Sequence, residues 1–355
     1  MIGKALGIIA LAAFLTAASP APKTSPTPQP TPDPLERLTA AYQQLLGHVD
    51  TFQKLMGEYE TSDLSARLED DISALSFPQT PEGVAPDDWQ QRLDQVAALD
   101  SSIVEQVLAG PLQPLAGVQG LQERMLASSI DGRLQPIAIY VPPTAGPHPS
   151  LVVLLHGRPQ TETQLLGWPY FRALADGTGT IIAAPYGRGS YDYEGPASQD
   201  VYQITDAMVA AYDVDPHHVY LAGYSMGGFT VFKVGPLHGA RWSAILCIGG
   251  AILNSETAAV RSQLQGTPFY VVTGKHDVNI PAQYGELTAD YLAGVGINTE
   301  FDEQPDGTHY LSTLIPALTT AWDDMLAGVV KHRPEVTIGD MPGFTMPQTD
   351  DSLRP

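Results

Sequence analysis

The stretch Val219-Tyr220-Leu221-Ala222-Gly223-Tyr224-Ser225-Met226-Gly227-Gly228 decides the fold. Its first four residues form an apolar run typical of a buried strand, and a helical pattern follows Ser225. Gly223 to Gly227 fits G-x-S-x-G, a pattern that holds its serine on a sharp turn between a strand and a helix. The glycines on either side of Ser225 leave room where backbone crowds backbone. We therefore predict that Ser225 is a nucleophile at the start of a helix.

Short apolar runs alternate with helical stretches on both sides of this turn. The runs predicted to be strands are 137–141, 151–155, 180–184, 219–222, 244–248, 269–273 and 297–301. The stretches predicted to be helices are 201–212, 226–235, 283–293 and 310–329. This alternation predicts an α/β fold, a mostly parallel sheet with helices on both faces. In such sheets the chemistry lies beyond the carboxyl ends of the strands.

A serine hydroxyl needs a base to become a nucleophile at neutral pH, and the base needs an orienting acid. In enzymes with this kind of serine turn, the three residues follow one another along the chain in the order serine, acid, histidine. His309 follows in a turn, 306–310, that enters the last predicted helix, and we predict that it is the base. The alternatives are His276, which abuts a strand, and His332, which ends a helix.

Asp277 is the predicted acid because it comes just after the 269–273 strand. Asp302, Glu303 and Asp306 are the alternatives. The oxyanion of an acyl-transfer intermediate needs two donors. We predict the backbone amides of Met226 and Arg158, with Gly157 as the second choice after Arg158. The side chain of His156 is expected to be structural, since it precedes Ser225 in the chain. The aromatic residues expected near strand ends, where they could line a pocket, are Trp168, Tyr170, Tyr186, Tyr191, Tyr193 and Tyr224.

Composition limits the partners. The 355 residues carry a formal net charge of −21, which should repel nucleic acid and anionic membranes. The single cysteine, Cys247, rules out an internal disulfide and is expected to be a small buried hydrophobe. No H-E-x-x-H motif, cysteine cluster or phosphate-binding glycine loop is present, so no metal or cofactor is expected. Arg158 and Arg188 could hold a substrate carboxylate, or could be solvated.

The chain organisation follows from changes in composition along the sequence. Residues 1–18 read as a signal peptide, which predicts a secreted or periplasmic protein with no further membrane span. Residues 19–34 are a proline-rich linker. Apolar residues at steps of three and four predict a helical region at 35–128, for packing or as a cap or binding spacer. The catalytic domain follows at 129–332, and 333–355 is predicted to be a flexible acidic tail.

The segments 129–142, 151–157, 214–228 and 274–281 resemble the α/β-hydrolase superfamily. More narrowly, they are similar to secreted esterases related to feruloyl esterase and polyhydroxybutyrate depolymerase, and to the catalytic domain of prolyl-oligopeptidase-type hydrolases. The resemblance implies an α/β-hydrolase fold, with metal-free hydrolysis through an acyl-enzyme by Ser225, Asp277 and His309. The helical region is not the β-propeller of the oligopeptidases. The disulfide near the active site of many feruloyl esterases is impossible here.

Three functions remain open at this point. The first is a serine carboxylesterase acting on a small-molecule or polymer ester. The second is a serine peptidase of the prolyl-oligopeptidase kind. The third is a non-catalytic binding protein on a hydrolase scaffold. Acyl and alcohol specificity and the oligomeric state are not indicated by the sequence.

Overall fold

The computed structural model describes residues 33–37, 39, 40, 43, 62–75, 85–110, 112–190 and 192–331. The chain divides after Pro32 into two compact units, and all the described residues belong to the second, Asp33–Pro355. The predicted signal peptide, nearly all of the predicted linker and the predicted tail lie outside the described residues, so these assignments stay predictions.

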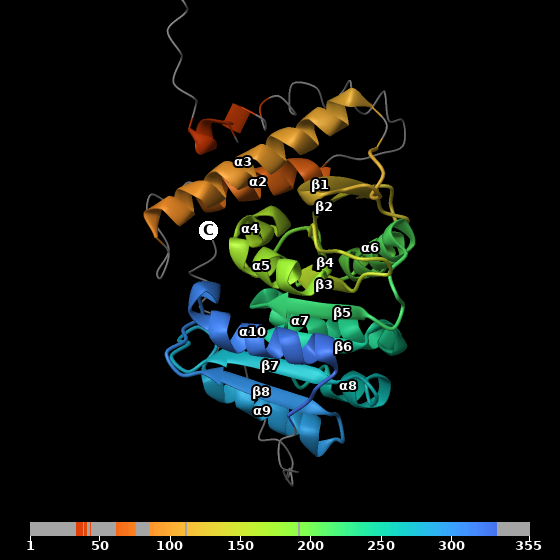
Figure 1. Cartoon of the computed structure of the whole chain (residues 1–355), viewed down its shortest axis with the longest axis vertical. Coiled ribbons are helices and arrows are strands. Elements are labelled where there is room, and N and C mark those ends of the chain that lie inside the picture. Colours follow the sequence, from red (N-terminus) through yellow and green to blue (C-terminus); the bar gives the residue numbers. More distant parts are fainter. Residues whose placement is uncertain are drawn as a thin grey trace, which may run out of the picture. The chain divides into compact units, whose positions relative to one another are not determined.

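Eight strands form one sheet in the order β1-β2-β4-β3-β5-β6-β7-β8 (Figure 1). β2 pairs antiparallel with both β1 and β4, and every other neighbouring pair is parallel. Each apolar run predicted to be a strand forms one, and the mostly parallel sheet is confirmed. The strands are β1 (Gly120–Ala127), β2 (Leu134–Val141), β3 (Leu151–Leu155), β4 (Ile181–Pro185), β5 (Val219–Tyr224), β6 (Ala244–Ile248), β7 (Phe269–Gly274) and β8 (Thr299–Gln304).

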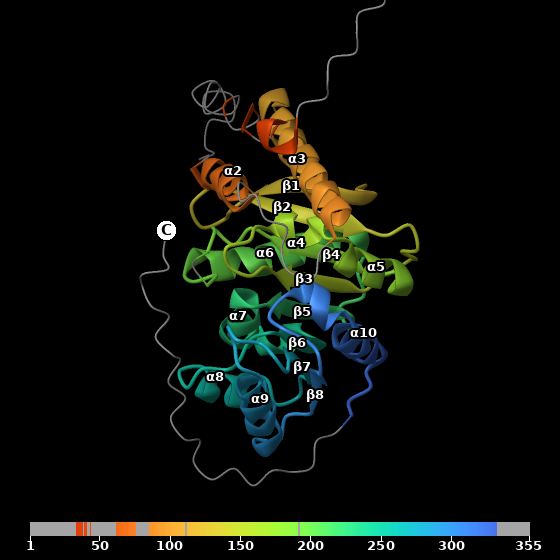
Figure 2. The ribbon, with the colours of Figure 1, turned by 90° about the vertical axis from the view of Figure 1, so that its left-hand side faces the viewer.

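Helices cover both faces of this sheet, as the sequence predicts. Alternate residues of β3 belong to different cores because successive strand side chains point to opposite faces. The helices on the face of Val153 and Leu155 are α6 (Pro196–Tyr212), α7 (Met226–Val234), α8 (Thr257–Gln263) and α9 (Ala282–Gly294). The helices on the face of Val152 and Leu154 are α4 (Glu162–Gly167), α5 (Pro169–Thr178) and α10 (Leu311–Ala327). Figure 2 shows α7, α8 and α9 on one side and α5 and α10 on the other.

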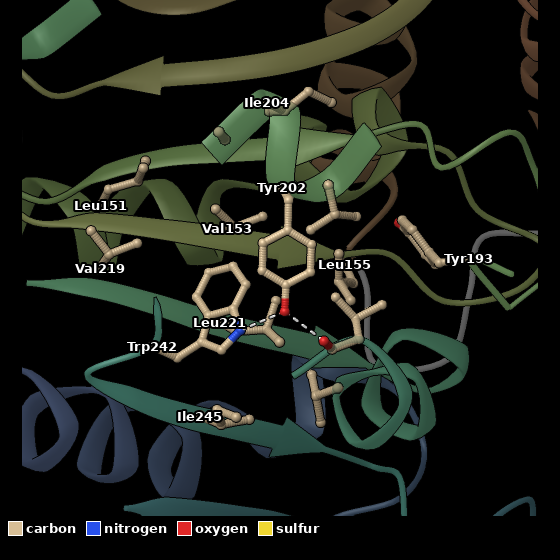
Figure 3. Close-up of a cluster of buried hydrophobic side chains, with 14 of the residues drawn as sticks. Leu151, Val153, Leu155, Tyr193, Tyr202, Ile204, Val219, Leu221, Trp242 and Ile245 are labelled. Atoms are coloured by element: carbon tan, nitrogen blue, oxygen red, sulfur yellow. Dashed lines mark hydrogen bonds between the residues drawn. The ribbon is translucent and has the colours of Figure 1, made fainter. Parts of the chain in front are cut away.

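The first of these cores contains a buried tyrosine that anchors the end of α7. The Tyr202 hydroxyl donates to the carbonyl oxygen of Val234 at 2.6 Å and accepts from the indole nitrogen of Trp242 at 3.2 Å (Figure 3). The carbonyls in the last turn of a helix lack partners within the helix. Tyr202 therefore satisfies one of these groups at the end of the helix that begins beside Ser225, and its own buried hydroxyl is fully used.

The region predicted to be helical, 35–128, contains helices α2 (Ser62–Leu75) and α3 (Pro86–Ala109) but ends in strand β1. The expectation of a wholly helical region was wrong at this point. Residues 120–127 are rich in Leu, Gln, Glu, Arg and Met, which favour helices, and pairing with β2 overrides that preference. Leu64 and Leu68 of α2 share a core with Ile103 of α3 and Met125 of β1. The two helices thus pack directly on the antiparallel edge of the sheet.

Two further expectations concern the burial of Cys247 and the presence of membrane-spanning helices. Cys247 is fully buried on β6, as predicted, and burial raises the pKa of its thiol to about 12. Among the helices that the structure describes, none is long and apolar enough to cross a bilayer.

Candidate active site

Ser225 sits between the last residue of β5 and the first residue of α7, as the G-x-S-x-G pattern predicts. Its backbone has φ 54° and ψ −114°, a conformation that is costly for a residue with a side chain. The strain is held by the surroundings: the Ser225 amide donates to the Ile248 carbonyl at 2.9 Å, and the Gly227 amide donates to that of His156 at 3.1 Å. Neighbouring strands therefore fix the turn.

The glycines around Ser225 are required by close backbone approach. A Cβ atom at Gly223 would lie 2.1 Å from the carbonyl oxygen of Gly227. One at Gly227 would lie 2.3 Å from that of Leu155, and one at Gly228 would lie 2.8 Å from that of Ile248. Each distance is too short for a real contact. The predicted reason for the glycines on either side of Ser225 is confirmed, and Gly228 meets the same limit against β6.

The loops after β7 and β8 bring Asp277 and His309 to Ser225. The Nδ1 atom of His309 lies 2.7 Å from Oδ2 of Asp277, and its Nε2 atom lies 2.9 Å from Oγ of Ser225. A histidine between a carboxylate and a hydroxyl can accept the hydroxyl proton while the carboxylate stabilises its charged form. The structure thus joins the three predicted residues in one hydrogen-bonded chain.

Backbone donors and close packing hold this chain in place. The other oxygen of Asp277, Oδ1, accepts from the amides of Asn279 at 2.9 Å and Ile280 at 2.7 Å. These bonds fix the orientation of the carboxylate beside His309. The Tyr224 hydroxyl donates to the carbonyl oxygen of His309 at 2.7 Å, and the two rings lie 5.5 Å apart. Tyr224 therefore ties the residue before the serine to the residue that would act as base.

The two predicted oxyanion amides lie at the ends of adjacent strands. Leu155 of β3 is paired in register with Gly223 of β5, which brings the loop after β3 beside the serine. A Cβ atom at Gly157 would lie 3.0 Å from Cβ of Ser225. Within the described part of the chain, neither the amide of Met226 nor that of Arg158 has an acceptor. Both are therefore free donors near Ser225.

His156 is structural in its contacts, as expected. Its Nδ1 lies 2.9 Å from the carbonyl oxygen of Gly157, and its Nε2 lies 2.8 Å from that of Tyr186. Both ring nitrogens are thus occupied by backbone. The alternative base His276 and the alternative acids Glu303 and Asp306 are exposed, and Asp302 is half-buried. None of these has a hydrogen bond to Ser225 or His309 among the described residues. The alternative base His332 lies outside the described residues.

The two arginines suggested for a substrate carboxylate are used by the protein itself. Arg188 forms ion pairs with Asp131 at 2.6 Å and Asp200 at 2.7 Å. The Arg158 side chain pairs with Asp192 at 3.4 Å. Their positive charges are therefore largely compensated. Of the aromatic residues predicted near strand ends, Tyr191 lies outside the described residues.

Two groups near the site were missed in the sequence. One is the pair Arg67 and Asp71 of α2, which bind the segment after Arg158. The other is Arg92 of α3, which lies over Trp168. Both lie in the region 35–128, which was predicted to serve for packing or as a cap or binding spacer, and their partners are far along the chain. The amphipathic pattern in this region predicts which helix face is buried, but it does not indicate which charged side chains are buried with that face. Within the described ranges, no cluster of residues suited to a metal ion occurs.

Comparisons with known proteins place this geometry in a fold. No family model matches the chain. A bifunctional acetylxylan esterase/xylanase of Neocallimastix patriciarum is 29% identical over 146 residues. That match covers 40% of this chain but only 21% of the relative, so this chain spans about a fifth of its length.

Solved structures match over more of the chain. A ferulic acid esterase matches with a TM-score of 0.51 and 16% identity, covering 58% of this chain and 98% of its own. A fluorophosphonate-binding serine hydrolase of Staphylococcus aureus has a TM-score of 0.51 and 15% identity, covering 61% and 99%. A 2,6-dihydroxy-pseudo-oxynicotine hydrolase has a TM-score of 0.50 and 18% identity, covering 85% and 90%. Together with the strand order and the turn at Ser225, these likenesses show that the chain has the α/β-hydrolase fold.

Proposed function

We propose that the protein is a serine hydrolase that cleaves carboxylic esters through an acyl-enzyme. The observation that carries the proposal is the hydrogen-bonded chain Asp277–His309–Ser225, with 2.7 and 2.9 Å between its members. The partial likeness to an acetylxylan esterase and the fold shared with a ferulic acid esterase support an ester as substrate. The predicted signal peptide at 1–18 supports export from the cytoplasm, and an exported enzyme would meet esters outside it.

The mechanism begins at Ser225. His309 Nε2 takes the hydroxyl proton as Ser225 Oγ attacks the carbonyl carbon, and Asp277 stabilises the imidazolium that forms. The oxyanion accepts hydrogen bonds from the amides of Met226 and Arg158. His309 then gives its proton to the leaving alcohol. Water then enters, loses a proton to His309 and attacks the acyl carbon. The bond from that carbon to Ser225 Oγ breaks as His309 returns the proton to Oγ, so the carboxylic acid leaves and Ser225 is regenerated.

An ester is favoured over a peptide because an alcohol leaves more easily than an amine. The peptidase alternative is supported by the same three residues, and a panel of aminoacyl and peptidyl substrates separates the two. The binding-protein alternative would leave Ser225 unreactive.

The test uses 4-nitrophenyl acetate and a fluorophosphonate probe. Wild type is expected to hydrolyse the ester and to be labelled at Ser225, while Ser225→Ala loses both. Ser262→Ala is the matched control, since that serine is exposed at the end of α8. Equal rates for wild type and Ser225→Ala would refute the proposal.

A further inference from the structure

Arg92, near the start of α3, lies against a group of aromatic rings. Its Cζ atom is 5.1 Å from the ring centroid of Trp89 and 4.4 Å from that of Trp168. The ring of Tyr170 stacks on Trp168 with 5.7 Å between centroids and 12° between planes. A guanidinium over an aromatic face is attracted by the ring's electron density. These contacts hold the positive charge in one position and orientation.

Arg92 has no carboxylate partner in the described part of the chain. The residue is 4% exposed, and its Nε donates to the carbonyl oxygen of Gln164 at 3.2 Å. Neither Nη atom meets an acceptor among the described residues, and neither is among the polar atoms sealed from solvent. Burial lowers the pKa of Arg92 to about 9. Buried charges in proteins are normally paired, so this one has donors to spare for a ligand.

Asp71, the acid whose negative charge acts on Arg92, already accepts hydrogen bonds from other residues. Asp71 attracts Arg92 from beyond ion-pair distance. Its oxygens accept hydrogen bonds from Thr161, Thr163 and Gln164. Asp71 therefore moderates the cost of burying Arg92 without using its Nη groups.

The position of Arg92 connects it to the catalytic residues. Tyr170 packs against the same hydrophobic cluster as Tyr224, the residue before Ser225. The charge of Arg92 acts on the hydroxyls of both tyrosines. Tyr224 in turn binds the carbonyl of His309 at 2.7 Å. In Figure 1 the start of α3 and the start of α10, the helix that His309 precedes, both lie at the left of the view.

We infer that Arg92 recognises a carboxylate carried by the ester substrate, while the half-buried rings of Trp89 and Tyr170 contact the substrate's apolar part. This inference rests on the proposed ester hydrolysis. Arginine suits the role because its planar fork binds a carboxylate through two parallel hydrogen bonds. The substrate class is thus an ester with a free acidic group, such as an acyl or alcohol unit bearing a carboxylate on an aromatic ring.

The experiment compares esters that differ only in this charge. The first pair is 4-acetoxybenzoate and 4-acetoxybenzamide, with the group on the alcohol side. The second is the mono-4-nitrophenyl ester of terephthalic acid and its carboxamide, with the group on the acyl side. For at least one pair, wild type is expected to have a kcat/KM about tenfold higher for the carboxylate, equivalent to one well-placed charge-assisted contact.

Variants of Arg92 assign that preference. Arg92→Gln is expected to bring the ratio of the two kcat/KM values to about one, through a fall in the value for the carboxylate. Arg92→Lys keeps charge without the fork, so an intermediate ratio is expected. Arg241→Gln is the matched control, because Arg241 is paired with Asp206 on the surface, and its ratio should equal that of wild type.

A binding measurement covers the case in which Arg92→Gln does not fold. In Ser225→Ala, 4-hydroxybenzoate and terephthalate are added while tryptophan fluorescence is followed, with 4-hydroxybenzamide and terephthalamide as neutral partners. Saturable changes with a carboxylate alone support the inference. Equal responses to the carboxylate and the amide in both sets overturn it.

The two proposals fail in different ways. If no ester is hydrolysed and the fluorophosphonate does not label Ser225, the proposed function fails and the substrate class falls with it. If amide and carboxylate esters are hydrolysed by Ser225 at equal efficiency, and Arg92→Gln changes neither ratio, the role of Arg92 is refuted while the esterase proposal stands.

Discussion

Asp71 of α2 accepts a hydrogen bond of 2.8 Å from the hydroxyl group of Thr163, which lies 92 residues further along the chain. The same carboxylate accepts from the side chain of Gln164, also at 2.8 Å, and from the hydroxyl of Thr161. All four side chains are buried. This segment begins three residues after Arg158, whose amide is proposed to bind the oxyanion. Helix α2 is therefore bonded directly to the segment that follows Arg158.

Replacing Asp71 by Ala should shift the segment 161–164 and, with it, the loop that contains Arg158. We expect kcat to fall by about tenfold or more with a smaller change in KM, because a misplaced oxyanion donor affects the transition state most. Labelling of Ser225 by a fluorophosphonate should also slow. Asp94→Ala is the control, as Asp94 is exposed and pairs only with Arg37 among the described residues. A loss of stability with unchanged kcat would show that Asp71 does not position the loop.

Arg67 forms ion pairs with four buried acids. It lies 2.8 Å from Glu123, 2.7 Å from Glu162 and 3.4 Å from Asp71, and it also bonds Asp100. Every one of these side chains is fully buried. Burial raises the pKa values of Asp100 and Glu123 against the opposing charge of Arg67. The group links α2, α3, β1 and α4.

Arg67→Met should be strongly destabilising, by about 3–5 kcal/mol, because it leaves buried carboxylates without their cation. The loss should be smaller at pH 4 than at pH 8, since protonation removes the uncompensated charges. Urea unfolding at both pH values measures this. Arg241→Met, which breaks an exposed pair, should cost less than about 1 kcal/mol. Equal losses for the two variants would contradict this account.

The sequence was sufficient for the turn at Ser225 because its determinants are local. Gly223, Gly227 and Gly228 lie within a few residues, and short apolar runs before loops identify strands. His309 and Asp277 followed from chain order and from their places after strands. These inferences need no knowledge of which strands are neighbours.

The sequence was insufficient where partners are distant. Nothing near Arg67 indicates that Glu162, 95 residues away, completes its ion pairs. Arg92 looks like a surface residue of an amphipathic helix until Trp168 is packed beneath it. The prediction for residues 120–127 was wrong for the same reason, because pairing with β2, and not local preference, makes this segment a strand.

Gly223→Ala tests the steric requirement at the serine turn. Its methyl group would meet the Gly227 carbonyl at 2.1 Å, so β5 and α7 must separate. We expect a loss of about 3 kcal/mol in unfolding free energy and of nearly all hydrolysis. Gly177→Ala in α5 is the control, because its Cβ meets no atom within 4 Å and alanine favours a helix. Normal activity in Gly223→Ala would contradict the strained-turn geometry.

Asp277→Asn tests which acid orients the base. The amide keeps the shape of the carboxylate but removes its charge and can misorient the imidazole of His309. We expect kcat to fall by about 10³–10⁴-fold, with KM nearly unchanged. Asp306→Asn, at the exposed alternative acid, should leave kcat unchanged. A large fall with Asp306→Asn and not with Asp277→Asn would reverse the assignment.

Glu300 of β8 should make stability depend on pH. Its carboxylate is buried beside Asp302 and Asp324, and it accepts from the Lys331 amide at 2.8 Å. Burial raises the pKa of Glu300 to about 7, from an ordinary value near 4.5 in the unfolded chain. The folded state therefore binds more protons between these values, and the stability contributed by protonated Glu300 is present below about pH 4.5 and lost as pH rises through 7.

Glu300→Gln should remove this dependence, because the amide resembles the protonated acid at every pH. Between pH 5 and pH 8 wild type should lose on the order of 2 kcal/mol relative to the variant, measured by urea unfolding. Lys331, Asp302 and Asp324 remain in both proteins, so their effects largely cancel in the comparison. Glu105→Gln, at an exposed residue of α3, should follow wild type at both pH values. A parallel pH dependence for wild type and Glu300→Gln would mean that another group, such as Asp302, takes up the proton.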